Sequence, residues 1–310
     1  MHKLILPLAL AIPCWAQTPL VKGVGNFIHD VADLDQSVRF YRDLLGMDVP
    51  RPPGDWQTMD GVLKMYGAVG GKFRVANAQV TGVAMRVELV EFQGVDRKPV
   101  RRAPGEPGAA VLVLTVADLQ PVLDRLQAAT WPLAVKTTEA CDGRGMAVAD
   151  PDGFPVLVIQ PKAGAQPAPP AGRNFTGLRF TFTVSDDAVL NGPFQALALA
   201  GAPSTQSCRS VEEAVLSTGA PTIVKLPDGF ELRLVRAARG KKSAGQVRPR
   251  DPGAAVLRLM VPDVEAAVHA LGQSGIRVVS EGGAIQTLPP AGLRAAILAA
   301  PDNLFIQMVQ

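Results

Sequence analysis

Histidine is scarce in this 310-residue chain, which contains His2, His29 and His269 and no other. Zinc, iron and nickel in proteins are commonly held by imidazole together with carboxylate, so such chemistry would depend on these few residues. His29 lies in FIHDVADLDQSVRFYRDLLGMDV, which begins at Phe27. This segment reads as a strand followed by a helix, and His29 either binds a metal or only packs within the strand.

Two glutamates stand in strand-like segments that alternate between polar and apolar residues. Glu88 lies in AMRVELVEF and Glu231 in FELRLVR. Residues two apart in a strand share a face, so Glu88 lies beside Arg86 and Glu231 beside Arg233. A buried carboxylate must be paired or hydrogen-bonded. Each glutamate is therefore either half of an ion pair with its arginine or a polar anchor for a ligand.

No motif in the sequence predicts a nucleotide-dependent or serine-hydrolase reaction. The G-x-S-x-G pattern, the P-loop and the dinucleotide-binding fingerprint are all absent. The formal net charge of +3 is too near neutral to indicate nucleic acid as a partner. His269 follows Glu265 by four residues on the polar side of its predicted helix, and we expect it to be solvated.

The N-terminal segment resembles a signal peptide. A short basic start precedes the apolar run LILPLALAIP, and small residues before position 17 predict cleavage after Ala16. We expect residues 1–16 to be removed and the mature chain to be exported, periplasmic or secreted, with no later membrane span. An exported protein can form disulfides, but the sequence leaves open whether Cys141 and Cys208 pair.

A duplication organises the rest of the chain. PGAAVLVLTVADLQPVLDRL begins at Pro107 and PGAAVLRLMVPDVEAAVHAL at Pro252, and each reads as an alternating strand, an Asp and a helix. VGNFIHDV and RNFTGLRFTFTVSDD begin two further units of the same kind. We therefore predict an α+β protein made of four βαβββ units.

The units fall into two sequence halves. Residues 23–161 hold the first two units, residues 175–310 hold the last two, and a Pro/Ala-rich linker covers 162–174. In the first unit, Asp33 is suited to cap the helix that follows it, and Gly46 to end that helix in the left-handed conformation. The prediction is two tandem domains of two units each, and which units pair in space is left open.

Three stretches carry a family resemblance: VADLDQSVRFYRDLLG near the start, VELVEFQGV at the end of the first unit and DPDGFPVLV at the end of the second. They resemble the vicinal oxygen chelate superfamily, which includes glyoxalase I, extradiol dioxygenases and the bleomycin resistance proteins. The resemblance implies curved mixed sheets in which paired units form an open cup that holds the site. It is not specific for any reaction.

In the enzymes of this superfamily, metal ligands lie in the first and last strands of the units. The resemblance places Asn26, Val111, Arg179 and Val256 at the first-strand positions, and Glu88, Leu157, Glu231 and Gln307 at the last-strand positions. Only the two glutamates keep a usual ligand type, so the resemblance implies neither a metal site of the usual kind nor a cofactor. His29 lies three residues from Asn26 and so on the opposite face, which favours a structural role at the strand–helix seam.

These observations favour a metal-free protein that binds a small molecule in the cup. The candidate ligand-binding residues are Asn26, Glu88, Arg179, Glu231 and Gln307. Asn26, Glu88 and Gln307 can meet if the first and fourth units pair. One alternative is an isomerase, lyase or dioxygenase in which Glu88 acts as base or ligand. Another is a structural or interaction module whose cup is filled by its own side chains. The oligomeric state is left open.

Overall fold

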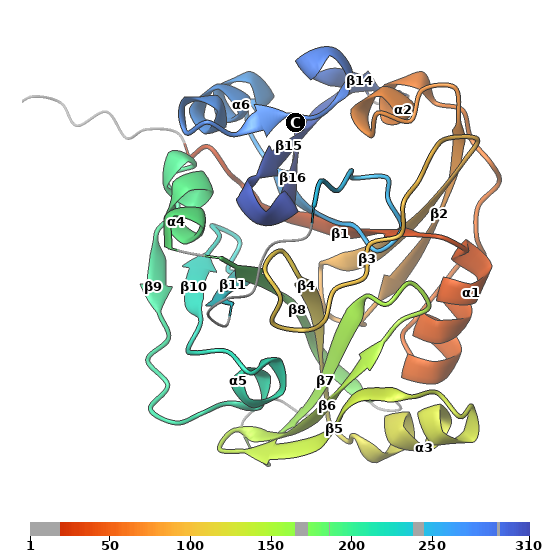
Figure 1. Cartoon of the computed structure of the whole chain (residues 1–310), viewed down its shortest axis with the longest axis vertical. Helices are drawn as coiled ribbons and strands as arrows, with labels where there is room; N and C mark the ends of the chain where they lie inside the picture. Colours follow the sequence, from red (N-terminus) through yellow and green to blue (C-terminus); the bar gives the residue numbers. More distant parts are fainter. Residues whose placement is uncertain (1–18, 165–172, 186, 238–244, 290–291) are drawn as a thin grey trace, which may run out of the picture.

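The computed structural model describes residues 19–164, 173–185, 187–237, 245–289 and 292–310. The expected signal peptide and most of the expected linker lie outside these residues. No helix in the described ranges is both long and apolar enough to cross a membrane. Two eight-stranded sheets form the framework, the first in the upper part of Figure 1 and the second in the lower part.

The first sheet combines the first and fourth units. Its strand order is β13-β15-β16-β12-β1-β3-β2, and β14 pairs with β15. The first unit contains β1 (Gly23–Val31), α1 (Leu34–Arg39), the π-helical turn η1 (Phe40–Leu45), α2 (Asp60–Met65), β2 (Lys72–Gln79) and β3 (Arg86–Gln93). The fourth contains β12 (Ala255–Met260), α6 (Val264–Gln273), β13 (Arg277–Val278), η2 (Glu281–Gly283), β14 (Gln286–Leu288), β15 (Leu293–Ala300), η3 (Pro301–Asn303) and β16 (Leu304–Val309).

The second sheet combines the second and third units, in the order β5-β6-β7-β4-β8-β11-β10-β9. The second unit contains β4 (Ala110–Val116), α3 (Gln120–Ala128), β5 (Leu133–Ala140), β6 (Gly143–Ala149) and β7 (Pro155–Pro161). The third contains β8 (Phe175–Val184), α4 (Asp187–Ala196), β9 (Gly201–Pro203), α5 (Val211–Leu216), β10 (Thr222–Lys225) and β11 (Glu231–Arg236).

The strand pairing confirms the α+β class and the four repeated units. In each unit the first strand runs parallel to the last, as in β1 with β3 and β12 with β16. Units join through antiparallel first strands, β1 with β12 and β4 with β8. Each sheet therefore takes one unit from each sequence half. The predicted halves, residues 23–161 and 175–310, are therefore segments of the sequence, and each sheet contains strands from both of them.

The ends of the first helix form as the sequence predicts. The Asp33 side chain accepts a hydrogen bond from the Gln36 backbone N–H at 2.9 Å. Gly46 ends the helical segment with φ of 91°, a conformation that glycine adopts without a steric cost. The segment itself changes from α-helix to a π-helical turn at Phe40.

The largest core lies between the two sheets and includes residues from α1, α3 and α6. Phe27 of β1 stacks on Phe180 of β8, with ring centroids 3.5 Å apart. The opposite face of each sheet has a smaller core of its own. We call these faces the first cup, covered by Leu63, Met65 and Tyr66 at α2, and the second cup, covered by α5. Both short helices thus fill space that an open cup would leave to solvent.

Candidate functional site

Glu88 in the first cup is held by an arginine from the fourth unit. The two Nη groups of Arg258 donate to the two carboxylate oxygens of Glu88 at 3.0 and 3.1 Å. Asn26 Nδ2 also donates to Glu88 at 2.8 Å, and Arg258 Nε donates to Gln307 Oε1 at 2.6 Å. Three predicted site residues therefore meet, because the first and fourth units share a sheet. The cation beside Glu88 is Arg258, not the Arg86 named by strand alternation.

Arg258 is the residue of this cluster that sequence reasoning missed. The resemblance assigned Val256 to the first-strand position, and Val256 is buried in the apolar part of the first cup. Arg258 follows two residues later on the same face. Burial lowers the pKa of Arg258, but the charges of Glu88 and Tyr66 and the hydrogen bond to Glu88 together outweigh burial, so the pKa lies above its ordinary value. The sequence feature that could have identified Arg258 is the presence of one charged residue within the otherwise apolar strand AAVLRLM.

The cluster of Asn26, Glu88 and Gln307 does not fit the metal ion that enzymes of the superfamily use. Glu88 supplies the one carboxylate, and a guanidinium already engages both of its oxygens. Asn26 and Gln307 are amides, and Gln307 directs its Nε2 to Met65 Sδ at 2.9 Å. Fe(II), Ni(II) and Zn(II) sites need imidazole and carboxylate groups that are free to coordinate. No chemical step through such a metal follows from this cluster.

Two further polar groups in the first cup lack partners. Asp30 lies two residues after Ile28 on the same strand face and is fully buried. Within the described residues, neither its carboxyl oxygens nor the hydroxyl of Tyr66 has a hydrogen-bond partner. Burial raises the pKa of Asp30 well above its ordinary value, although Arg97 opposes the shift. The Asp30 carboxyl is therefore neutral over a wider pH range than a solvated aspartate.

A hollow of about 480 Å³ lies over β2, the strand next to the one that carries Glu88. Its floor includes Asn77 of β2, which is the register partner of Glu88 and so lies on the same sheet face. Across from it is the segment around Pro50 to Gly54. Arg51 and Arg86 line the hollow, and neither forms an ion pair with another described residue. Asn77 Oδ1 is buried and has no partner in the described part of the chain.

The two predicted site residues of the second cup are not brought together. Arg179 forms an ion pair at 2.8 Å with Glu212 of α5, which sequence analysis did not single out. Arg233 contacts the same carboxylate at 3.3 Å. Glu231 lies at the rim, with a side chain 39% exposed, and pairs with Lys225 at 3.4 Å. The expected pairing of Glu231 with Arg233 is therefore absent, since Arg233 turns toward Glu212.

His29 lies on the sheet face opposite to Glu88, as strand alternation predicts. Its Nε2 is 2.7 Å from Asp150 Oδ2 and its Nδ1 is 3.2 Å from the Ala254 carbonyl oxygen. Since a carboxylate and a carbonyl both accept, this geometry fits an imidazolium that donates from both nitrogens. Burial lowers the pKa of His29, but the charge and hydrogen bond of Asp150, the charge of Asp152 and the hydrogen bond to Ala254 together outweigh burial, and the net shift is upward. The Tyr41 hydroxyl also donates to Asp150 at 3.2 Å.

The structure adds a group that sequence analysis did not predict. Ligand-type atoms of His29, Asp150 and Asp152 lie within 4.8 Å of one another, and the set could hold a metal ion. The prediction that the chain lacks metal ligands is therefore not supported. Sequence analysis named the two aspartates only as part of the family stretch DPDGFPVLV. In the structure they bond Ala32, His29 and Tyr41, which joins the first unit to the second.

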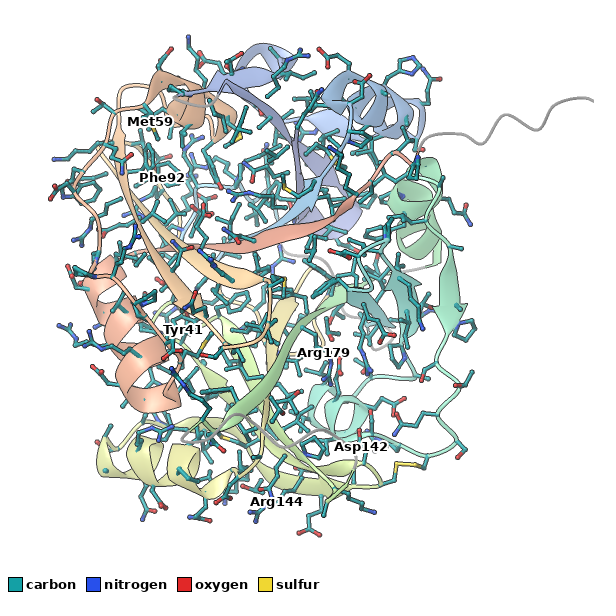
Figure 2. The ribbon with its side chains drawn as sticks, turned by 180° about the vertical axis from the view of Figure 1, so that it is seen from behind. Tyr41, Met59, Phe92, Asp142, Arg144 and Arg179 are labelled. Atoms are coloured by element: carbon teal, nitrogen blue, oxygen red, sulfur yellow. A yellow bond between two sulfur atoms is a disulfide. The ribbon has the colours of Figure 1, made fainter. Side chains whose placement is uncertain are left out.

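Cys141 and Cys208 form a disulfide, with Cα atoms 6.2 Å apart. The sequence had left this pairing open. The bond, yellow in Figure 2, links the turn between β5 and β6 to the segment that leads into α5. It therefore holds the entrance of α5 against the second sheet.

Residues 30–158 match the Glyoxalase/Bleomycin resistance protein/Dioxygenase superfamily. Glyoxalase I from Zea mays has a similar structure, with a TM-score of 0.62 and 16% identity over 93% of this chain and 92% of that chain. A putative dioxygenase from Bacillus subtilis subsp. subtilis str. 168 gives a TM-score of 0.58 and 12% identity over 94% and 86%. No curated protein sequence is matched. Residues 30–158 are thus similar to this superfamily, and the structural similarity over most of the chain establishes a shared fold.

Proposed function

We propose that this protein binds a small anionic molecule in the first cup without a metal ion. The observation that carries the proposal is the bidentate contact of Arg258 with Glu88, which puts a protein cation where the superfamily's enzymes need a metal. The hollow over β2, which Asn77 lines next to Glu88 in the sheet register, supplies the space. Its volume of about 480 Å³ lies within the usual range for ligand pockets, roughly 300–1,000 Å³.

The charges around the hollow favour an anion. Arg51 and Arg86 both line it and have no carboxylate partner among the described residues. Asn77 adds an amide whose oxygen is unpaired there. A carboxylate or phenolate ligand would satisfy the arginines through charge-assisted hydrogen bonds.

The two alternatives are less well supported for the first cup. A general base needs an oxygen that can reach the proton of a substrate, and both oxygens of Glu88 already accept from Arg258. A structural module with a filled cup accounts for α2 and its apolar contacts, but not for the hollow beside them. The N-terminal segment and the disulfide support an exported location.

A ligand screen tests the proposal. Thermal-shift measurements on dialysed protein, with a panel of small carboxylates and phenolates, should give hits in wild type that weaken in Arg86→Gln and Asn77→Ala. Arg277→Gln, on β13 at the other edge of the same sheet, is the matched control and should keep every hit. Equal shifts in all four proteins, or binding that disappears with a chelator, would contradict metal-free binding at this hollow.

A further inference from the structure

A buried carboxylate of the chain itself occupies the second cup. The Glu212 side chain is 2% exposed and lies between two arginines on neighbouring strands. Arg179 Nη2 of β8 donates to it at 2.8 Å, and Arg233 Nη1 of β11 donates at 3.3 Å. The Thr181 hydroxyl donates to the other oxygen. Figure 2 labels Arg179 and Asp142 on either side of α5, the helix that carries Glu212.

The positive groups outnumber the carboxylate that they hold. Two guanidinium groups face one glutamate, and the Nε–H groups of both Arg179 and Arg233 are buried with no partner in the described ranges. The arginines outweigh burial and lower the pKa of Glu212. Burial, and then the like charge of Arg179, lower the pKa of Arg233. The second cup therefore stabilises an anion, and it has two N–H donors that no described residue engages.

The helix that delivers Glu212 is short and depends on attachments at its start. It spans only Val211–Leu216 and begins with a capping box between Ser210 and Glu213. The Val211 N–H donates to Asp142 Oδ1 at 2.7 Å, and the disulfide fixes the chain three residues before the helix. Isolated helices of this length do not persist in water. The position of Glu212 therefore rests on these attachments and on the apolar contacts of α5.

We propose that Arg179, Arg233 and Thr181 form a binding site for a small carboxylic acid, and that α5 closes this site with its own Glu212. The Glu212 side chain and an external carboxylate present the same group to the two arginines and compete for it. The Cys141–Cys208 bond keeps the internal competitor in place. This site belongs to the second sheet and does not depend on the function proposed for the first cup.

Removal of the internal carboxylate tests the site. Calorimetric titration of the full-length Glu212→Ala protein with sodium propionate, which corresponds to a glutamate side chain from Cβ to the carboxylate, should show binding at least tenfold tighter than in wild type. Propionamide, the neutral analogue, should not bind. Arg233→Gln added to Glu212→Ala should abolish propionate binding, whereas Arg277→Gln added in the same way should leave it intact. Equal binding of propionate and propionamide, or none, overturns the proposal.

A second experiment removes the disulfide and leaves Glu212 in place. The Cys141→Ser, Cys208→Ser protein should bind propionate at least fivefold more tightly than wild type. Propionate should also raise amide hydrogen exchange across residues 209–218 in that variant, as α5 is displaced. Unchanged affinity and unchanged exchange would show that α5 is a fixed part of the fold and would overturn its role as a competitor. If Glu212→Ala fails to fold, Glu212→Gln replaces it, with the same expected preference for propionate over propionamide.

Discussion

Arg258 and Glu88 are 170 residues apart in the chain and meet through two parallel hydrogen bonds on one face of the first sheet. The contact joins the fourth unit to the first across β1, because β12 and β3 lie on either side of β1 in that sheet. Both side chains are about one fifth exposed, so solvent weakens the pair only in part.

Glu88→Gln should lower the free energy of unfolding by about 1–3 kcal/mol, because it leaves the Arg258 charge in a poorly hydrated place. The double variant Glu88→Gln, Arg258→Met should recover part of that loss. Urea denaturation of the wild type, both single variants and the double variant measures the coupling. If the two single effects simply add, the ion pair does not hold the units together.

The free energy of unfolding should depend on pH through the protonation of His29. Its pKa in the folded protein is raised above 6.5, so its contribution is fully present below pH 6.5 and is lost as pH rises through the folded pKa. We expect a smaller free energy of unfolding at pH 9 than at pH 6. The fall should be reduced in Asp150→Asn, since Asp150 is the main cause that raises the pKa. An identical fall in both proteins would place the titrating group elsewhere.

Asp30→Asn should stabilise the protein at neutral pH. The pKa of Asp30 in the folded state lies well above 3.8, so the native protein holds this proton longer than the unfolded chain does. The wild type therefore loses stability as pH rises from about 4 toward the folded pKa, and asparagine removes that loss. Thermal melts of both proteins at pH 4 and pH 7 should give a larger difference at pH 7. A lower melting temperature for Asp30→Asn at pH 7 would mean that the charged form has a partner.

The His29 group offers a direct test of metal binding. We expect protein dialysed against a chelator to keep its melting temperature, and His29→Ala to lose about 1–3 kcal/mol of stability, because a packed and hydrogen-bonded side chain is removed. Ligand binding in the first cup should not change, since His29 lies on the opposite face. Elemental analysis of the wild type and of His29→Ala compares their metal content. One metal ion per wild-type chain that is missing from His29→Ala would identify the cluster as a metal site.

The sequence predicted what depends on local pattern. The four units follow from alternating strands and amphipathic helices, and Asp33 and Gly46 mark the ends of the first helix because capping involves only neighbouring residues. Strand alternation, together with the family position of Asn26, placed His29 on the face opposite to Glu88. These features need no knowledge of which units pair.

The missed residues depend on contacts between distant segments. Arg258 reaches Glu88 only because the first and fourth units share a sheet, a pairing that the sequence left open. Glu212 lies in a six-residue helix between short strands, too brief for a clear periodicity. Asp150 was named only as part of a family stretch, and its bond to His29 crosses between the two sheets. No local pattern encodes any of these three contacts.

The pairing of β1 with β12 has a consequence for the order in which the protein can form. The sheet partner of His29 in this pair is Ala255, more than 220 residues later in the chain. At a synthesis rate of about 5–20 residues per second, roughly 10–50 s separate their appearance. During that time the edge of β1 that will pair with β12 has no strand beside it. Its unpaired backbone groups are open to association with other chains. A ribosome therefore releases nearly the whole chain before either end can complete its sheet, and separate expression of the two halves would leave both sheets unfinished.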